Sequence, residues 1–169
     1  VSANTEAGFS VVSYTGNGAN GTVGHGLNNT PKVVILKTRN ITEDWIVLAV
    51  PEEIGVGRLK LSTTDAFSSS NATEYFNNTL PNENTFSLGV WMADAAKNII
   101  AYCFAEVEGF SNFGSYVGTG ASGNTIVTGF EPAFVMIKRT DSTGNWFMLD
   151  NKRDNTNPNN LFLLANASD

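Results

Sequence analysis

Few residues of this chain are charged, and a single one is cysteine. Lysine, arginine, aspartate and glutamate together make up 15% of its 169 residues, against roughly 25% in ordinary soluble domains. Because Cys103 stands alone, no disulfide can form within the chain. The surrounding run at residues 99–107 predicts a buried strand. We therefore expect Cys103 to be a small core residue rather than a nucleophile, which would need exposure and a cationic neighbour.

Positive charge and long apolar runs are also scarce. The net charge is -6 and the pI is near 4.7, so the molecule as a whole repels the phosphate backbone of a nucleic acid. No stretch approaches the roughly 20 apolar residues that a membrane-spanning helix needs. We therefore expect neither a nucleic-acid partner nor a membrane partner.

A pattern for long helices is missing as well, because no segment keeps apolar residues at the 3.6-residue period. Glycine, asparagine, serine and threonine are abundant instead. Glycine and asparagine tolerate the positive φ angles of turns, and threonine suits exposed strands. Short apolar runs with turn signals about every eight to twelve residues are typical of sandwiches and barrels. The sequence predicts an all-β fold, an antiparallel β-sandwich of the jelly-roll kind.

The expected strands follow from these runs. Residues 92–97 are predicted to be a hairpin loop rather than a helical turn, because strand-like runs lie on both sides. The core is expected to form around residues 33–36, 99–107 and 134–137. Strands are predicted at residues 11–15, 22–27, 32–38, 44–49, 59–61, 73–76, 85–91, 98–107, 133–138, 145–149 and 161–166.

The chain repeats itself with a period of about 101 residues. Gly8-Phe9-Ser10 recurs at residues 109–111, and the run at 161–166 is similar to the run at 59–64. The repeat keeps apolar alternation and turn glycines but no reactive group, which indicates a duplicated structural unit. Three further anchors recur at the same distance: Pro31, Lys37 and Trp45 as Pro132, Lys138 and Trp146.

The repeat divides the chain into a first β unit at residues 1–108 and a partial second unit at 109–169. The two could instead pack as one continuous β-sandwich domain. Because the second unit stops at Asp169, soon after its last predicted strand, we expect the chain to be a fragment or processed piece of a longer array.

The glycine-rich run at residues 16–21 matches the GxGxxG spacing of dinucleotide-binding loops. That fingerprint works only where the glycines begin a helix whose amides meet the pyrophosphate. A strand is predicted here instead, so we interpret the run as a β-turn and expect no cofactor.

Metal and catalytic constellations are equally hard to assemble. His25 is the only histidine, so neither a zinc site nor a Ser-His-Asp triad can be argued, and a position at a strand end or in a loop is expected for it. We predict a non-enzymatic protein with no catalytic residues, no metal and no assigned ligand-binding residues. The carboxylate pairs that could serve a glycosidase are Glu52 with Glu53, Glu106 with Glu108, and Asp141 with Asp150. The side chains that could offer oxygen ligands to calcium are Asp141, Asn145 and Asp150.

Three tryptophans remain as candidates for contact with a ligand. Trp45 and Trp146 hold the same position in both units, and Trp91 is the last residue of the predicted strand at 85–91. Exposed aromatic rings stack on sugars, but a duplicated tryptophan in an alternating run more often packs in a core or between units. Packing is the interpretation we favour.

The longest motifs, at residues 100–111 and 129–141, resemble an uncharacterised repeat family of bacteriophage virion proteins found in marine and cyanobacterial phages. The resemblance covers most of the chain and implies β-rich modules of tail fibres or other surface proteins, some with concanavalin-like relatives. It implies a structural component on the virion surface that contacts copies of itself and other virion proteins. The alternative it implies is a lectin-like module that binds host-surface glycan. It supplies no catalytic residues.

Overall fold

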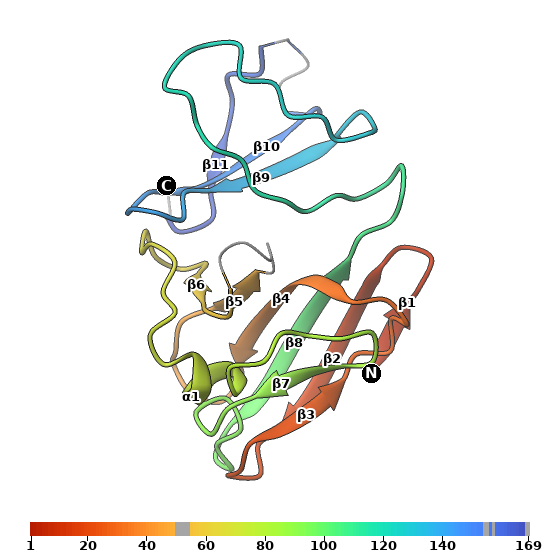
Figure 1. Cartoon of the computed structure of the whole chain (residues 1–169), viewed down its shortest axis with the longest axis vertical. Coiled ribbons are helices and arrows are strands. Elements are labelled where there is room, and N and C mark those ends of the chain that lie inside the picture. Colours follow the sequence, from red (N-terminus) through yellow and green to blue (C-terminus); the bar gives the residue numbers. More distant parts are fainter. Residues whose placement is uncertain (50–54, 154–155, 157, 168–169) are drawn as a thin grey trace.

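The computed structural model describes residues 1–49, 55–153, 156 and 158–167, and nearly all of its regular structure is antiparallel β (Figure 1). One short helix, α1 (Ala72–Phe76), occurs among these residues. The strands are β1 (Ser2–Asn4), β2 (Phe9–Thr15), β3 (Gly21–Gly24), β4 (Pro31–Thr38), β5 (Ile46–Ala49), β6 (Leu59–Lys60), β7 (Thr85–Leu88), β8 (Asn98–Ala105), β9 (Phe134–Lys138), β10 (Trp146–Asp150) and β11 (Leu163–Leu164).

A six-stranded sheet forms the larger part of the molecule, in the order β1-β2-β8-β4-β5-β6. β8 lies at its centre, between β2 and β4, and pairs with both in antiparallel register. Each of these long strands alternates buried and less buried residues, as expected for a sheet with one fully covered face. The predicted strand at 98–107 is therefore confirmed as the central strand, ending at Ala105.

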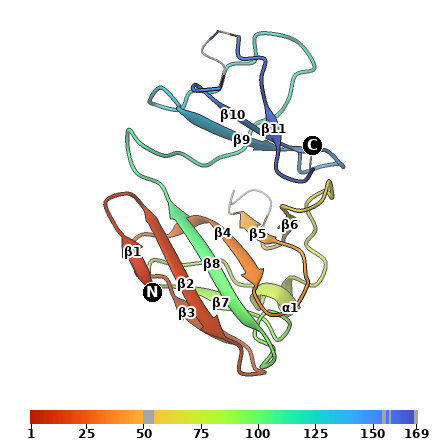
Figure 2. The same ribbon diagram turned by 180° about the vertical axis from the view of Figure 1, so that it is seen from behind.

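A second layer covers one face of this sheet. β3 and β7 pair with each other and cross in front of β2 and β8 in Figure 1, and Figure 2 shows the opposite face with β2, β8 and β4 in front. Side chains from β7 and α1 fill the space between the layers, because Phe76 and Phe86 are fully buried. The same cluster includes Val12, Val34, Leu36, Ile46, Leu48, Met92, Ile99, Ala101 and Cys103.

The strand predicted at residues 73–76 is wrong, because α1 forms there. Asn71 and Asn77 bracket the helix in the left-handed region, with φ of 62° and 50°. Ala72 and Phe76, four residues apart, both point into the core. One turn of helix places both side chains on one face, but a strand would do the same at a spacing of four residues, so the spacing alone does not distinguish the two. Residues 92–97 form a loop as predicted, but the hairpin is wrong, because β7 pairs with β3 whereas β8 pairs with β2 and β4 in the other sheet.

Residues 134–164 form a separate three-stranded sheet in the order β11-β10-β9. Its pairing is that of β4 with β5, moved along the chain by 101 residues: Val34 faces Leu48, and Val135 faces Leu149. The outer strand follows the same rule, since Leu59 faces Val47 and Leu163 faces Met148. The counterpart of Leu59 is thus Leu163, two residues later than the sequence comparison placed it.

The expectation that residues 134–137 form part of the core is wrong. Val135 is 37% exposed, whereas Val34, its counterpart in register, is fully buried. The difference lies in the covering layer: β7 and α1 lie over β4, and no described strand or helix plays that part for β9. Burial here depends on a neighbouring element rather than on the strand's own sequence.

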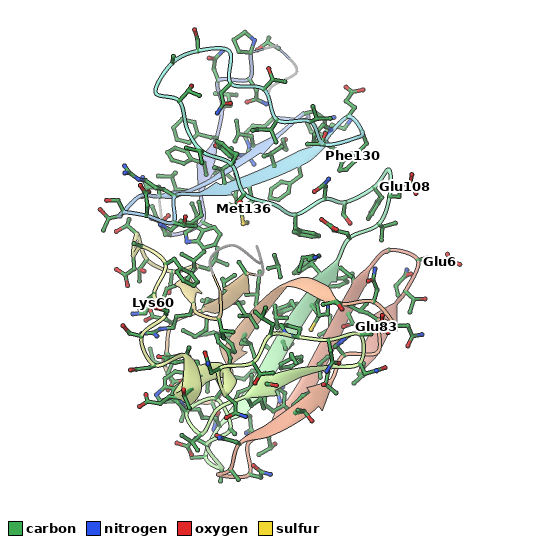
Figure 3. All side chains as sticks on the ribbon, viewed as in Figure 1. Glu6, Lys60, Glu83, Glu108, Phe130 and Met136 are labelled. Atoms are coloured by element: carbon green, nitrogen blue, oxygen red, sulfur yellow. The ribbon has the colours of Figure 1, made fainter. Side chains whose placement is uncertain are left out.

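The two sheets meet through a small apolar cluster. Trp146 is 6% exposed and packs with Val47 and Leu59 of the six-stranded sheet. Its indole Nε1 donates a 2.9 Å hydrogen bond to the carbonyl of Lys60. Figure 3 shows Met136 on the side of β9 that faces the larger sheet. The packing role favoured for the repeated tryptophan is confirmed for Trp146.

Candidate functional site

The glycine-rich run at residues 16–21 connects β2 to β3, so the β-turn interpretation is confirmed. Gly16 lies against the backbone of residues 93–94, where an added Cβ would stand 2.0 Å from the carbonyl oxygen of Asp94. Gly18 has φ of +82°, and its amide donates to the carbonyl of Ala93 at 2.7 Å. Close packing at Gly16 and the positive φ of Gly18 are therefore sufficient reasons for glycine at these positions.

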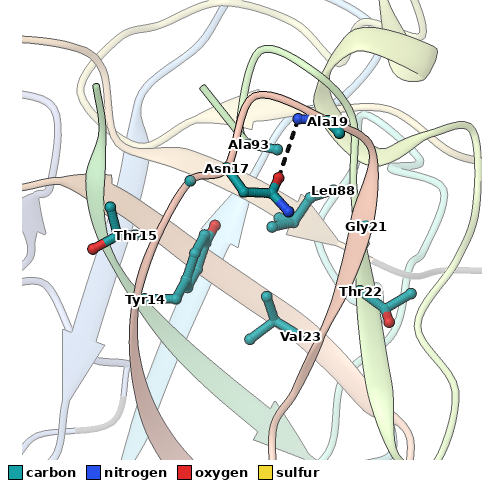
Figure 4. Close-up of a pocket in the computed structure, with 10 residues that line it drawn as sticks. Tyr14, Thr15, Asn17, Ala19, Gly21, Thr22, Val23, Leu88 and Ala93 are labelled. Carbon is teal, nitrogen blue, oxygen red and sulfur yellow. Dashed lines mark hydrogen bonds between the residues drawn. The ribbon is translucent and has the colours of Figure 1, made fainter. Parts of the chain in front are cut away.

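A small hollow lies beneath this turn, and Figure 4 shows its walls. Tyr14 and Val23 form its floor, and Leu88 and Ala93 close one side. Burial raises the pKa of the Tyr14 phenol far above its usual value, and its hydroxyl has no hydrogen-bond partner among the described residues. The volume is about 130 Å³, well under the roughly 300 Å³ at which ligand pockets begin. The hollow is too small for a sugar or nucleotide.

His25 follows β3 directly, as expected, and is fully buried. Its Nδ1 accepts a 3.3 Å hydrogen bond from the amide of Leu27, so Nε2 carries the proton and donates to the carbonyl of Asn82 at 3.0 Å. Both ring nitrogens are therefore used to join two loops. In this arrangement His25 has a structural role.

Cys103 is a fully buried residue of β8, which confirms its assignment to the core. Burial raises the pKa of its thiol to about 11, although the Ser10 hydroxyl on the paired strand opposes the rise. A thiol with this pKa is almost entirely protonated near neutral pH. It therefore lacks the thiolate that nucleophilic chemistry needs.

The carboxylates weighed for catalysis or calcium are not brought together. Glu106 lies beyond the end of β8 and accepts the amide of Phe113, and Glu108 is in the following turn, so the two do not share a strand face. Asp141 pairs with Arg139, and Asp150 pairs with Arg153. Glu52 and Glu53 lie outside the described residues. Among the residues that are described, no cluster of three metal-ligating side chains occurs.

One buried charged group was not found by sequence reasoning. The Lys97 side chain is buried, and its ammonium forms an ion pair of 2.9 Å with Glu43. The same ammonium lies 3.1 Å from the centroid of the Trp91 ring and donates to the Trp91 carbonyl at 2.9 Å. Thr38 donates to the other carboxylate oxygen of Glu43 at 2.6 Å. This network ties the β4–β5 loop to the β7–β8 loop, and every one of its charges is paired.

Trp45 differs from Trp146 in being partly exposed. Its ring stacks on Tyr102 at 6.3 Å between centroids and lies 5.8 Å from the ammonium of Lys37. It lines a hollow of about 340 Å³ together with Leu61 and Ser62 of the larger sheet's edge and Ala165 after β11. This volume is within the range of ligand pockets. The hollow has apolar walls, one hydroxyl and an aromatic face, which are the features that sugar rings contact.

Exposed apolar side chains are concentrated in the last third of the chain. Among the described residues, three exposed large hydrophobic side chains precede residue 109: Val1, Ile41 and Val90. The other twelve are Phe110, Tyr116, Val117, Ile126, Val127, Phe134, Val135, Met136, Phe147, Leu161, Phe162 and Leu163. Exposed apolar side chains of this kind are typical of an interaction surface where they form a contiguous patch.

A family model described as a domain of unknown function (DUF7483) matches residues 1–169. The chain belongs to this family. No curated protein and no solved structure matches it. The part of this DUF7483 chain that the structure describes contains no helix long and apolar enough to cross a membrane.

The features of this DUF7483 domain that sequence reasoning missed depend on contacts between distant segments. Lys97 contacts Glu43, and no described strand or helix covers the exposed face of β9. Neither is visible as a local motif.

Proposed function

We propose that this protein is a structural module of the outer surface of a bacteriophage particle, built from one complete β-sandwich unit and part of a second. Its work is contact and assembly with copies of itself or with other virion proteins. The proposal extends the resemblance of residues 100–111 and 129–141 to phage repeat proteins. It assigns no catalytic role to any residue.

The concentration of exposed apolar side chains in residues 109–163 is the observation that carries this proposal. Phe147 is 38% exposed, whereas Ile46, at the same place in the pairing of the first unit, is 2% exposed. Two strands with one register and opposite burial indicate that the second needs a cover from elsewhere. Fully burying a fully exposed side chain of this size contributes about 1.5–3 kcal/mol, so covering the exposed part of Phe147 contributes a fraction of this and favours association.

The matching registers also support the duplicated unit. The pairing of β9 with β10 reproduces that of β4 with β5 position by position. The next bond matches too, because the amide of Leu61 donates to the carbonyl of Trp45 and that of Ala165 donates to the carbonyl of Trp146. Two hairpins that agree in this detail are expected from one repeated unit.

Intact particles test the virion role directly. Antibodies raised against the purified chain should label the outside of phage particles that carry this sequence, and the chain should be detected by mass spectrometry of purified particles. Labelling is expected to disappear from particles in which the coding sequence is deleted. Detection of the protein in infected cells but never in purified particles would contradict the proposal.

A second candidate function, a lectin-like module that binds host glycan, is favoured by the hollow beside Trp45. A glycan array probed with the purified chain tests it. If this role is real, binding should be lost in Trp45→Ala and kept in the control Phe110→Ala, which removes an exposed ring elsewhere. An array without signal would remove this candidate and leave the assembly role in place.

A further inference from the structure

The hollow beside Trp45 lies where the two sheets meet. The edge of the larger sheet supplies three of its walls, Trp45, Leu61 and Ser62. The three-stranded sheet supplies Ala165, which directly follows β11 and its bend. Leu61 and Ala165 also pack against the apolar cluster around Trp146 that joins the sheets. The hollow is therefore a gap in the packing between the two sheets.

The repeat explains why this gap is open. Ala165 holds the place in the second unit that Leu61 holds in the first, because their amides donate to the carbonyls of Trp146 and Trp45 respectively. Leucine at this place fills more space than alanine. The smaller side chain of Ala165 thus leaves room beside Trp45, on the side of the hollow that the three-stranded sheet forms.

We propose that the hollow binds a single neutral ring with one apolar face and hydroxyl groups at its edge, the chemistry of a pyranose sugar, and that the bound ring holds the three-stranded sheet against the larger one. The inference rests on the lectin-like role, the second candidate function above, and adds a structural consequence to it. A ligand that contacts both sheets binds while they are together, so its binding opposes their separation.

The size of the hollow and its aromatic wall suit one ring. Its volume of about 340 Å³ is near the lower end of the roughly 300–1,000 Å³ of ligand pockets. The indole of Trp45 is held in place by Tyr102, at 6.3 Å between ring centroids and 22° between ring planes. A wall that is already fixed loses little freedom when a ligand binds. Leu61 and Ala165 add aliphatic surface for the apolar face of the ring.

The charges beside the hollow balance one another. The ammonium of Lys60 lies 3.0 Å from the carboxylate of Asp44 and 3.4 Å from that of Asp65. The ammonium of Lys37 lies 5.8 Å from the centroid of the Trp45 ring. Two ammonium groups thus stand with two carboxylates, so the surroundings favour neither an anion nor a cation. A neutral ligand fits this balance.

Ser62 supplies a hydrogen-bond acceptor for the edge of the ring. Its hydroxyl donates to Asp44 Oδ1 at 3.0 Å, so its oxygen is left to accept a hydrogen bond. Hydrogen bonds from Lys60 and then from Ser62 hold the pKa of Asp44 below its usual value, which keeps this carboxylate an acceptor near neutral pH. The ligand should therefore carry a donor, such as a hydroxyl group, on the edge that meets Ser62.

Nuclear magnetic resonance of the full chain tests the binding. The probes are the methyl glycosides of glucose, galactose, mannose and N-acetylglucosamine, each titrated alone. At least one should shift the indole signal of Trp45 saturably and leave that of Trp91 unchanged. Glucuronic acid and glucosamine are charged forms of a similar ring, and they should bind no more tightly than the neutral glycoside.

Hydrogen exchange measures the effect of the bound ring on the two sheets. With the glycoside at about ten times its Kd, separation of the sheets should be suppressed about tenfold. Exchange at residues 134–150 should slow by the same factor wherever it requires this separation. Exchange in β8, at the centre of the larger sheet, should not change.

Two matched variants locate the site. Ala165→Leu gives the second unit the residue that the first carries as Leu61, and it should fill the hollow. Glycoside binding should weaken by at least about tenfold, which corresponds to 1.4 kcal/mol, and exchange at residues 134–150 should slow without any ligand. Ala121→Leu adds the same volume at an exposed residue outside the hollow and should change neither. Circular dichroism checks that both variants keep the fold.

Three results would overturn the inference. They are a saturable shift at other tryptophans but not at Trp45, unchanged exchange at residues 134–150 under saturating glycoside, and wild-type binding by Ala165→Leu. A glycan-array signal that depends on Trp45, found together with any of these or without binding of a single glycoside, would keep the lectin-like role and reject the ring between the sheets. Absence of binding in the array and in the titrations would remove both, and the virion role would stand.

Discussion

The ammonium of Lys97 lies 3.1 Å from the centre of the Trp91 ring and 2.9 Å from the carboxylate of Glu43. A buried pair of this kind costs desolvation energy on both sides, so its removal is most damaging when one partner stays. It joins two loops at the same end of the larger sheet, between β4 and β5 and between β7 and β8.

Lys97→Met should therefore destabilise the protein by about 3–5 kcal/mol, because the Glu43 carboxylate would stay buried without its cation. Glu43→Gln keeps an acceptor for Thr38 and should restore part of this loss when combined with Lys97→Met. Urea unfolding of the two single variants and the double variant measures the coupling. Additive losses would mean that the pair does not interact energetically.

Val34→Asp and Val135→Asp make the same change at equivalent positions of two hairpins. The first buries a carboxylate with no partner and should prevent folding. The second changes a side chain that is 37% exposed and should cost no more than about 1.5 kcal/mol. Thermal melts monitored by circular dichroism compare them. A Val135→Asp variant that is unfolded at 25 °C would show that β9 is part of the core after all.

Trp146→Ala should loosen the three-stranded sheet and leave the larger one folded. The substitution removes the centre of the cluster with Val47 and Leu59 and the hydrogen bond to Lys60. Losses of about 3–5 kcal/mol are usual for a buried tryptophan. Hydrogen exchange should accelerate at residues 134–150 and stay slow in β8. Trp45→Ala serves as the control. Equal acceleration of exchange in both variants would contradict the role of Trp146 in holding the three-stranded sheet to the larger one.

Alkaline pH should destabilise the fold through Cys103. Its pKa is raised by burial from 9.0 to about 11, so the folded state favours the protonated thiol. The resulting stability is complete below pH 9 and is lost as pH rises through 11, by at most about 1.4 kcal/mol per pH unit. Tyr14, whose pKa is also raised by burial, adds to the loss above pH 10. Cys103→Ala should flatten the pH dependence between 9 and 11; an unchanged slope would reject the thiol as its source.

The larger sheet was predictable because its strands carry their own signals. The alternation in β4 and β8 and the turn residues between strands are local properties, and the structure reproduces those strands within a few residues. α1 was missed although Ala72 and Phe76 are four residues apart and Asn71 and Asn77 favour positive φ. The run is so short that its sequence fits a strand as well as a helical turn, and packing against the core around Phe86 decides between them.

The state of β9 could not be predicted from its sequence. Both β9 and β4 are apolar, so their sequences predict the same burial for the two strands. Burial is decided by the elements that cover a strand, and these come from elsewhere in the chain. His25 illustrates the same limit, since its partner carbonyl belongs to Asn82, 57 residues away.

The cluster of Val47, Leu59 and Trp146 also sets the mechanical order of the molecule. A force that pulls the smaller sheet away from the larger one would act on this small apolar cluster and a few hydrogen bonds, such as that from the amide of Phe67 to the carbonyl of Thr140. The strands of the larger sheet share load across many parallel bonds. Under tension the contact between the two sheets would therefore break first, and the larger sheet would stay folded.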